Sequence, residues 1–346
     1  MTKLIELKDK VFKFCAEYET RLKLVYRFVL ALVLFCIINN SVGFMEKIST
    51  FPVAFVLALL CCVLPQSVTV VVAAVLVLLN LYALSLEVAL TALIIFVVLF
   101  LLYFRFAPKD TTLFILTPIL FKLKIPYILP IGSGLLRNAY SVVAVICGTI
   151  SFYFVDGIYQ NVTSLASTIV DGEEAATAKF TITVSQLLSN KEMYLMVAIS
   201  LLTAIVVYLV RRLSVEHAWK IAIVSGVLVQ ISGLFAGYLL FSISGKTVGM
   251  IIGNIVAMLI GFVLEFLFMD LDYERTERIQ FEDDDYYYFV KAVPKKMVTS
   301  SEKTVKHFGN TASMGKRVPS SKTKMIKEGG KRNIAEELDI DEDLLN

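Results

Sequence analysis

The chain has 346 residues, of which 57% are hydrophobic and 18% are charged, and its formal net charge is +3. Its mean hydropathy is +0.75. A chain this apolar cannot expose its side chains to water and stay soluble, whereas a lipid bilayer accepts them. The composition therefore excludes a water-soluble domain and predicts a polytopic membrane protein.

The N-terminal segment, residues 1–27, mixes both charge signs and has no small-residue cleavage site, so we do not interpret it as a removable signal peptide. Its apolar residues recur at helical spacing: Leu4, Leu7, Val11, Phe14 and Tyr18. This pattern predicts an amphipathic cytoplasmic helix on the inner face of the membrane. A helix that binds a partner protein is the alternative.

A membrane-spanning helix needs about 20 predominantly apolar residues. Six segments approach or reach that length: Phe28–Met45, Val68–Leu84, Val88–Phe104, Met193–Val210, Ala218–Leu240 and Val248–Met269. Two shorter apolar segments, Pro52–Leu64 and Ala139–Val155, bring the number to about eight. The sequence therefore predicts an all-α integral membrane protein with a first bundle at 28–155 and a second at 191–269.

Clusters of positive charge orient these spans, because Lys and Arg concentrate in cytoplasmic loops. The clusters lie at Arg21, Lys23 and Arg27, at Arg105 and Lys109, at Arg211 and Arg212, and in the tail after the last span. We therefore expect a cytoplasmic-membrane protein with both termini in the cytoplasm.

The segment 113–137 interrupts the first bundle. Its two apolar pieces, Leu113–Phe121 and Ile125–Leu136, are each too short to span comfortably, and prolines and glycines lie in or beside the second piece. This pattern predicts a re-entrant helical hairpin, which a membrane tolerates only inside protein or beside a wet cavity. Broken helices of this kind mark substrate sites in many transporters. A plain loop or two short spans are the alternatives.

A weak internal sequence repeat also favours a transporter. Phe51–Pro52 recurs about 74 residues later as Ile125–Pro126, and Ser67–Val68 recurs as Ser141–Val142. Paired interrupted segments point to a transporter site. Two dipeptide matches in apolar sequence also arise by chance.

Polar side chains within apolar segments are a further pointer, because they are costly in lipid and turn toward the protein interior. They are Asn39, Asn40, Asn80, Glu87, Arg137, Asn138, Gln230, Asn254 and Glu265. Glu87 lies in a predicted outer turn, and Glu265 is close enough to the inner interface to reach water. The predicted solute site is Gly132, Ser133, Gly134, Arg137, Asn138, Gln230 and Asn254.

The last two spans carry small residues at four-residue spacing. Gly233 and Gly237 form one pair, and a stripe follows at Gly249, Gly253, Ala257 and Gly261. Such stripes let helix backbones approach closely. They predict helix packing, either within the chain or in a homo-oligomer.

Known enzyme and metal motifs are missing from the sequence. The five cysteines form no CxxC pair, and the two histidines lie in unrelated contexts. Ser242–Thr247 resembles the end of a phosphate-binding loop but lacks its first glycine. We expect no metal, no cofactor and no catalytic residue.

The segments outside the membrane are predicted from their patterns. Residues 156–190 should form an extracytoplasmic cap, with an interfacial helix and then a short strand at Ala178–Val184. Residues 270–294 should form a cytoplasmic β-hairpin, with strands Glu277–Phe281 and Tyr286–Val293. A hairpin alone is marginally stable, so we expect it to pair with another chain, with a cytoplasmic protein partner or with the loops of the membrane domain.

The C-terminal segment, residues 295–346, is first basic and then acidic, without apolar periodicity up to Arg332. This composition predicts a disordered tail. Basic residues beside an inner leaflet indicate contact with anionic lipid rather than with nucleic acid.

Three segments, "LYALSLEVALTALI", "YFRFAPKD" and "FEDDDYYYFVKAVPK", resemble an uncharacterised multi-pass membrane protein family of anaerobic Gram-positive bacteria. The resemblance implies a location in the cytoplasmic membrane and no assigned function. Three functions remain open: a small-solute carrier, which the broken segment favours slightly, a scaffold that recruits a partner through its hairpin and tail, and a membrane enzyme on lipid-linked substrate.

Overall fold

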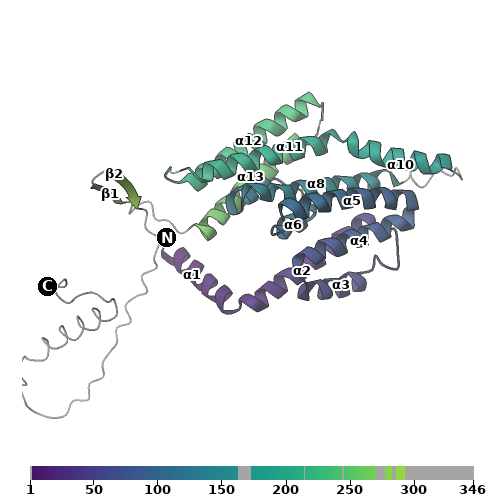
Figure 1. The fold of residues 1–346 in the computed structure, drawn as a ribbon, viewed down its shortest axis with the longest axis horizontal. Helices are drawn as coiled ribbons and strands as arrows, with labels where there is room; N and C mark the ends of the chain where they lie inside the picture. Colours follow the sequence, from purple (N-terminus) through teal and green to yellow (C-terminus); the bar gives the residue numbers. More distant parts are fainter. Residues whose placement is uncertain are drawn as a thin grey trace, which may run out of the picture. The chain divides into compact units, whose positions relative to one another are not determined.

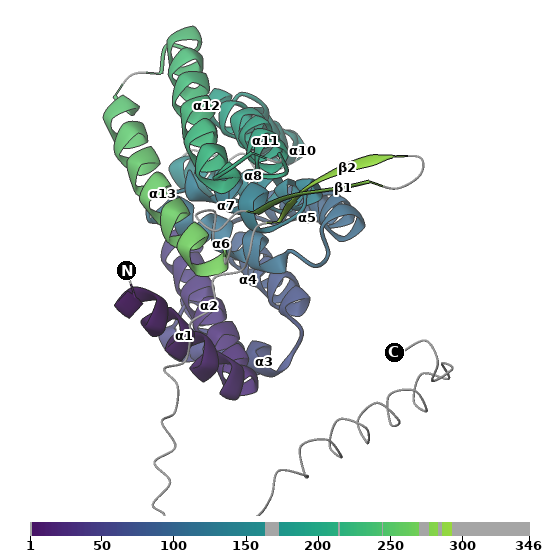
Figure 2. The ribbon, with the colours of Figure 1, turned by 90° about the vertical axis from the view of Figure 1, so that its left-hand side faces the viewer.

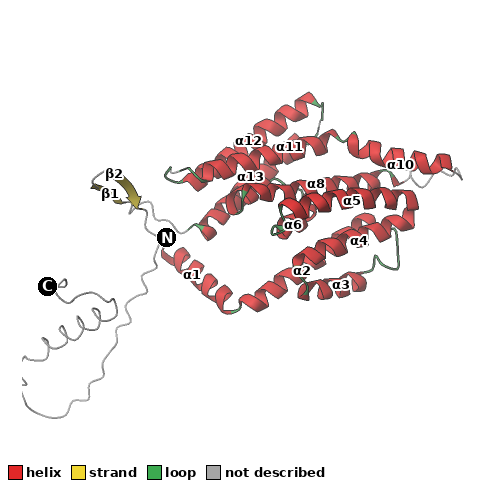
Figure 3. Cartoon of the chain, in the orientation of Figure 1, coloured by secondary structure: helices red, strands yellow, loops and turns green. Residues whose placement is uncertain are grey.

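A computed structural model describes residues 2–162, 173–213, 215–243, 245–269, 277–282 and 286–292. Within these ranges the chain forms twelve α-helices, one short 3-10 helix and a single two-stranded sheet (Figures 1 and 3). The predicted all-α architecture is therefore confirmed, with the hairpin as its only β-structure in the described part.

The first half of the chain contains eight of these helices and the 3-10 turn η1. They are α1 (Thr2–Glu17), α2 (Glu19–Val42), α3 (Phe51–Val63), α4 (Gln66–Leu84), α5 (Leu86–Phe106), α6 (Thr111–Lys122), α7 (Ile128–Leu136), η1 (Ala139–Ser141) and α8 (Val142–Gln160). The second half contains α10 (Glu173–Leu188), α11 (Lys191–Arg211), α12 (Ala218–Leu240) and α13 (Thr247–Phe268), then β1 (Glu277–Glu282) and β2 (Tyr287–Ala292).

Seven of the described helices are long and apolar enough to cross a bilayer, as expected of a membrane-embedded protein. They are α2, α4, α5, η1 with α8, α11, α12 and α13. The eighth predicted span, Pro52–Leu64, is α3, which has only 13 residues. The number of eight spans stays a prediction, because a helix of that length reaches only about 20 Å.

The N-terminal helix ends earlier than expected. The sequence predicts one element over residues 1–27, whereas α1 stops at Glu17 and α2 begins at Glu19, so the basic residues of 19–27 belong to the first long helix. The apolar residues Leu7, Val11 and Phe14 of α1 are exposed. Lys8 Nζ donates to the carbonyl of Phe266 at 2.7 Å, which joins α1 to the end of α13.

The strand predicted at Ala178–Val184 is wrong, because this segment lies inside α10. Its β-branched residues suggested a strand, but Thr183 Oγ1 donates to the carbonyl of Lys179 four residues earlier, as threonine does in helices. Contacts with α5 and α8 favour the helix over local strand propensity. The predicted interfacial helix falls mostly in 163–172, outside the described residues.

The predicted β-hairpin is present. β1 and β2 pair antiparallel, with Glu277 opposite Ala292 and Glu282 opposite Tyr287. The aromatic side chains of Tyr286, Tyr287 and Phe289 are exposed. The basic and acidic tail, residues 295–346, lies outside the described residues.

The buried side chains form two clusters that meet at α8. The first is built by α2, α3, α4, α5, α6 and α8, and the second by α7, α11, α12 and α13 with parts of α6 and α8. Figure 2 looks along the bundle and shows α7 beside α6, α8 and α13. The short helix α7 therefore lies within the second cluster rather than at its edge.

Candidate functional site

The helices α6 and α7 form a helical hairpin whose two ends meet. Asp110 precedes α6 and Arg137 follows α7, and Arg137 Nε lies 3.4 Å from Asp110 Oδ1. Ser141 Oγ donates to the other oxygen of the same carboxylate at 2.6 Å. The two helices are short, with 12 and 9 residues, and this carboxylate holds their outer ends together.

The turn between the two helices is closed by backbone hydrogen bonds. Lys124 has a φ of 61°, and the amides of Lys124 and Ile125 donate to the carbonyls of Phe121 and Leu120. A left-handed residue commonly ends a helix in this way, although glycine is the usual choice. Lys122 and Lys124 are exposed at this turn.

The helix α7 is enclosed by its neighbours. Seven of its nine residues are buried, and α7 contacts α8, α11, α12 and α13. Gly134 makes the contact with α11 possible, because a Cβ on it would lie 2.7 Å from the carbonyl oxygen of Ala204. A short helix with a proline at its third position is thereby held deep in protein.

Two buried amide side chains flank the start of α7. Gln230 on α12 is 2% exposed and Asn254 on α13 is 0% exposed. Gln230 Nε2 donates to the carbonyl of Tyr127 at 3.1 Å, and Asn254 Nδ2 donates to the carbonyl of Met250 at 2.9 Å. Since each nitrogen faces a backbone acceptor, the orientation of both amides is fixed.

The oxygens of the same two amides accept no hydrogen bond from any described residue. Both Gln230 Oε1 and Asn254 Oδ1 are buried and unpaired. An unpaired buried acceptor costs about 1–3 kcal/mol, so native proteins usually supply a partner or an ordered water. Each of the two oxygens therefore marks a position that requires a hydrogen-bond donor.

The two amides lie at the same level of the bundle. Gly261 on α13 packs against Ile223 on α12, and these antiparallel helices place Asn254 and Gln230 seven residues from that contact. Gln230 bonds the carbonyl of Tyr127, and the ring of Tyr127 packs on Gly253, the residue before Asn254. The site is thus built from α12, α13 and the hairpin turn.

Thr203 on α11 contributes a third unpaired group. Its hydroxyl is buried without a hydrogen-bond partner among the described residues. Its methyl group faces Gly226, one helical turn before Gln230 on α12. The amide site, as we call Tyr127, Thr203, Gln230 and Asn254, therefore involves three long helices and the start of α7.

Two further buried tyrosines accompany Tyr127 of the amide site. Tyr127, Tyr153 and Tyr238 are all buried in the second cluster. Beyond them, Lys246 Nζ pairs with Glu192 Oε2 at 2.6 Å, between the starts of α13 and α11. Polar groups thus extend from the amide site toward the bundle end.

The structure separates the site residues predicted from sequence. Gln230 and Asn254 lie at the same level of α12 and α13, whereas Arg137 and Asn138 are exposed at the opposite end of α7, so their expected burial is wrong. Ser133 is buried and donates to the carbonyl of Pro130. Gly134 serves packing, and a Cβ on Gly132 would meet nothing within 4 Å.

The remaining polar candidates have other roles. Asn80 is fully buried and satisfied, because its oxygen accepts from Met45 N and Ser49 Oγ and its nitrogen donates to Leu76 O. Asn39 has a buried amide without a partner in the described part. Glu265, expected to reach water, is 9% exposed.

The small residues of the last two spans pack within the chain. Gly233 and Gly237 face Ile199 and Leu195 of α11. In the stripe, Gly253 receives the Tyr127 ring, Ala257 is buried and Gly261 faces Ile223, while Gly249 has open space. A homo-oligomer stays a prediction, and most of the stripe is already used inside the chain.

Sequence reasoning missed Tyr127 and Thr203. Threonine is common in apolar helices, and Tyr127 contributes its backbone carbonyl, so neither gives a compositional signal. Among the described residues no group of three or more His, Cys, Asp or Glu side chains could hold a metal ion. Comparison with known proteins gave no match to a family model, a curated protein or a solved structure.

Proposed function

We propose that this chain is a non-enzymatic carrier or permease of the cytoplasmic membrane that binds a small polar solute at the amide site. The observation that carries the proposal is the pair of fixed, buried and unpaired amide oxygens of Gln230 and Asn254 beside a broken helix. A solute with N–H or O–H groups would supply the missing donors.

The proposed topology follows the positive charges. Both termini are cytoplasmic, and the α6–α7 hairpin enters from the cytoplasmic side and returns to it, so that its turn lies within the membrane. The ion pair of Asp110 with Arg137 supports this arrangement because it holds the two hairpin ends together. Membership of the uncharacterised multi-pass family is part of the same proposal.

Aqueous thiol labelling tests whether the site is wet. In a background with Cys15, Cys36, Cys61, Cys62 and Cys147 replaced, Asn254→Cys should react with a small membrane-impermeant methanethiosulfonate from one side of oriented vesicles. Leu259→Cys, on the exposed and lipid-facing side of the same helix, is the matched control and should stay unlabelled. Labelling of neither residue, while Lys109→Cys reacts, would contradict a solute path to the amide site.

A scaffold is the second candidate, and the exposed hairpin favours it. β1 and β2 pair only with each other among the described elements, and Tyr286, Tyr287 and Phe289 are exposed. Two strands alone are marginally stable, so a partner chain would complete the sheet. Deletion of residues 272–296 should abolish function if the chain is a scaffold and leave solute uptake intact if it is a carrier.

A further inference from the structure

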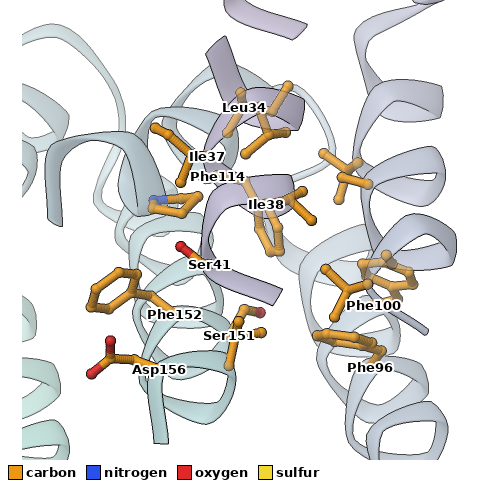
Figure 4. A pocket seen from close by; sticks show the side chains of 17 residues that line it. Leu34, Ile37, Ile38, Ser41, Phe96, Phe100, Phe114, Ser151, Phe152 and Asp156 are labelled. Atoms are coloured by element: carbon orange, nitrogen blue, oxygen red, sulfur yellow. The ribbon is translucent and has the colours of Figure 1, made fainter. Parts of the chain in front are cut away.

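An apolar pocket lies apart from the amide site, between α2, α4, α5, α6 and α8. Its volume is about 740 Å³, which includes space open to the surroundings. Most of its lining is aliphatic or aromatic, including Leu34, Val70, Phe96, Phe100 and Phe114 (Figure 4). A mostly apolar lining with a few polar groups is typical of sites for small organic ligands.

The space exists because the α4 wall is made of small side chains. Ala73 and Ala74 face the pocket, and Pro118 of α6 forms part of the opposite lining. Larger residues at the two alanines would fill it.

The polar groups of the pocket gather toward one end. Ser41 is one residue from the end of α2, and Ser151 and Asp156 lie on α8, with Asp156 in the last two turns of that helix. Leu34 lies deeper in the pocket, seven residues or about 10 Å before Ser41 along α2. Val70 lies the same distance before Val77 along α4. Figure 4 shows Asp156 beside Phe152, with Phe96 and Phe100 across the pocket.

The carboxylate of Asp156 is only half satisfied. Gln160 Nε2 donates to its Oδ2 at 2.7 Å. Its Oδ1 accepts no hydrogen bond from a described residue, and the ion pairs of the described chain do not include it. The side chain is only partly buried, so water solvates this oxygen, and a cation in the pocket would take the place of that water in a charge-assisted hydrogen bond.

From these observations we infer that the pocket binds a small amphiphile with one ammonium head group and an apolar body. The ammonium group pairs with Asp156 and the hydroxyl of Ser41 near the end of the bundle. The apolar body extends toward Leu34, Val70 and Phe114. A neutral amphiphile of the same shape would fill the apolar part but leave the carboxylate unpaired, so the charge determines the selectivity.

The test compares octylamine with octanol, which share the chain and differ in the head group. Binding of each radiolabelled compound is measured on the full chain purified in a neutral maltoside detergent. We expect octylamine to bind saturably and about tenfold or more tightly than octanol. Asp156→Asn should reduce octylamine binding to the octanol level without changing octanol binding. Equal binding of the two compounds by the unmodified chain, or unchanged octylamine binding by Asp156→Asn, would overturn the inference.

A second pair of variants tests the position of the ligand. Ala74→Phe fills the pocket and should weaken both compounds at least about tenfold, whereas Leu79→Phe, on the exposed side of the same helix, should bind them normally. If Ala74→Phe does not fold, Val77→Phe takes its place. Normal binding by a folded, filled variant would place the ligand elsewhere and overturn the inference. Neither result depends on transport at the amide site.

Discussion

Gln230 Nε2 donates to the carbonyl of Tyr127, 103 residues earlier in the chain, at 3.1 Å. This bond ties the middle of α12 to the turn that begins α7, at the carbonyl of its N-cap residue. It also fixes the amide so that its oxygen faces away from that carbonyl and stays unpaired. One side chain thus both supports the broken helix and presents an acceptor.

Replacing Gln230 by Met keeps the length of the side chain and removes both amide groups. The carbonyl of Tyr127, the N-cap of α7, would lose this second donor while the unpaired amide oxygen also disappears, so we expect a net loss of about 1 kcal/mol in stability. Thermal unfolding in detergent measures this. Ser232→Ala is the control, since Ser232 is exposed on the same helix, and should change stability by less than about 0.5 kcal/mol. Equal effects of the two substitutions would contradict a structural role for the Gln230 bond.

Two glycines of α7 should respond to alanine in opposite directions. A Cβ at Gly134 would lie 2.7 Å from the carbonyl oxygen of Ala204 and 2.9 Å from Val207 Cβ, so Gly134→Ala should destabilise the protein. Overpacking of this kind costs about 1–3 kcal/mol. A Cβ at Gly132 meets nothing within 4 Å, and Gly132→Ala should be stabilising by up to about 1 kcal/mol through helix propensity. If both substitutions shift the unfolding midpoint in the same direction, the result would contradict the position of α7.

The helices were predictable from sequence because each long one is a nearly continuous apolar run, as in Gln66–Leu84 and Ala218–Leu240. Which polar residues meet was not predictable. Arg137 and Asn138 follow the short helix α7. Whether the end of α7 lies inside the bundle depends on how α6 and α7 pack against the other helices, which the sequence does not reveal. Gln230 and Asn254 were identified because an amide within an apolar run must face protein.

The strand prediction failed because tertiary packing overrode the local preference of the sequence. Local β-branched composition at Ala178–Val184 competes with the packing of α10 on α5 and α8, and tertiary contacts decide. Likewise, the stripe of small residues in α13 predicted close helix approach without saying which helix approaches. The structure gives Tyr127 of the hairpin as the neighbour of Gly253 and Ile223 of α12 as the neighbour of Gly261.

The ion pair of Asp110 with Arg137, which joins the two ends of the α6–α7 hairpin, should contribute a small but measurable free energy of stabilisation. The Arg137 side chain is 52% exposed and that of Asp110 is 12% exposed, so solvent screens much of the ion pair. A double-mutant cycle with Asp110→Ala and Arg137→Ala should give a coupling of about 0.2–1 kcal/mol in stability. Asp110→Ala alone should cost more than Arg137→Ala, because it also removes the acceptor of Ser141 Oγ. A coupling of zero would mean that the ion pair does not hold the hairpin ends together.

Thr203→Val separates a binding role from a structural one. The two side chains have nearly the same shape, and the Thr203 hydroxyl is buried without a partner among the described residues, so its removal breaks no hydrogen bond within that part of the chain. We expect the variant to be as stable as the unmodified chain or more stable by up to about 1 kcal/mol, because an unsatisfied buried hydroxyl is lost.

If the amide site binds a polar solute, the same change should reduce uptake in vesicles about tenfold while the unfolding temperature is unchanged or raised. Thr149→Val on α8 is the matched control, because Thr149 is equally buried but donates to the carbonyl of Val145 at 2.8 Å. It should lower stability and leave the solute affinity as it is. A loss of stability in Thr203→Val with unchanged uptake would show that the hydroxyl has a structural partner and would remove Thr203 from the amide site.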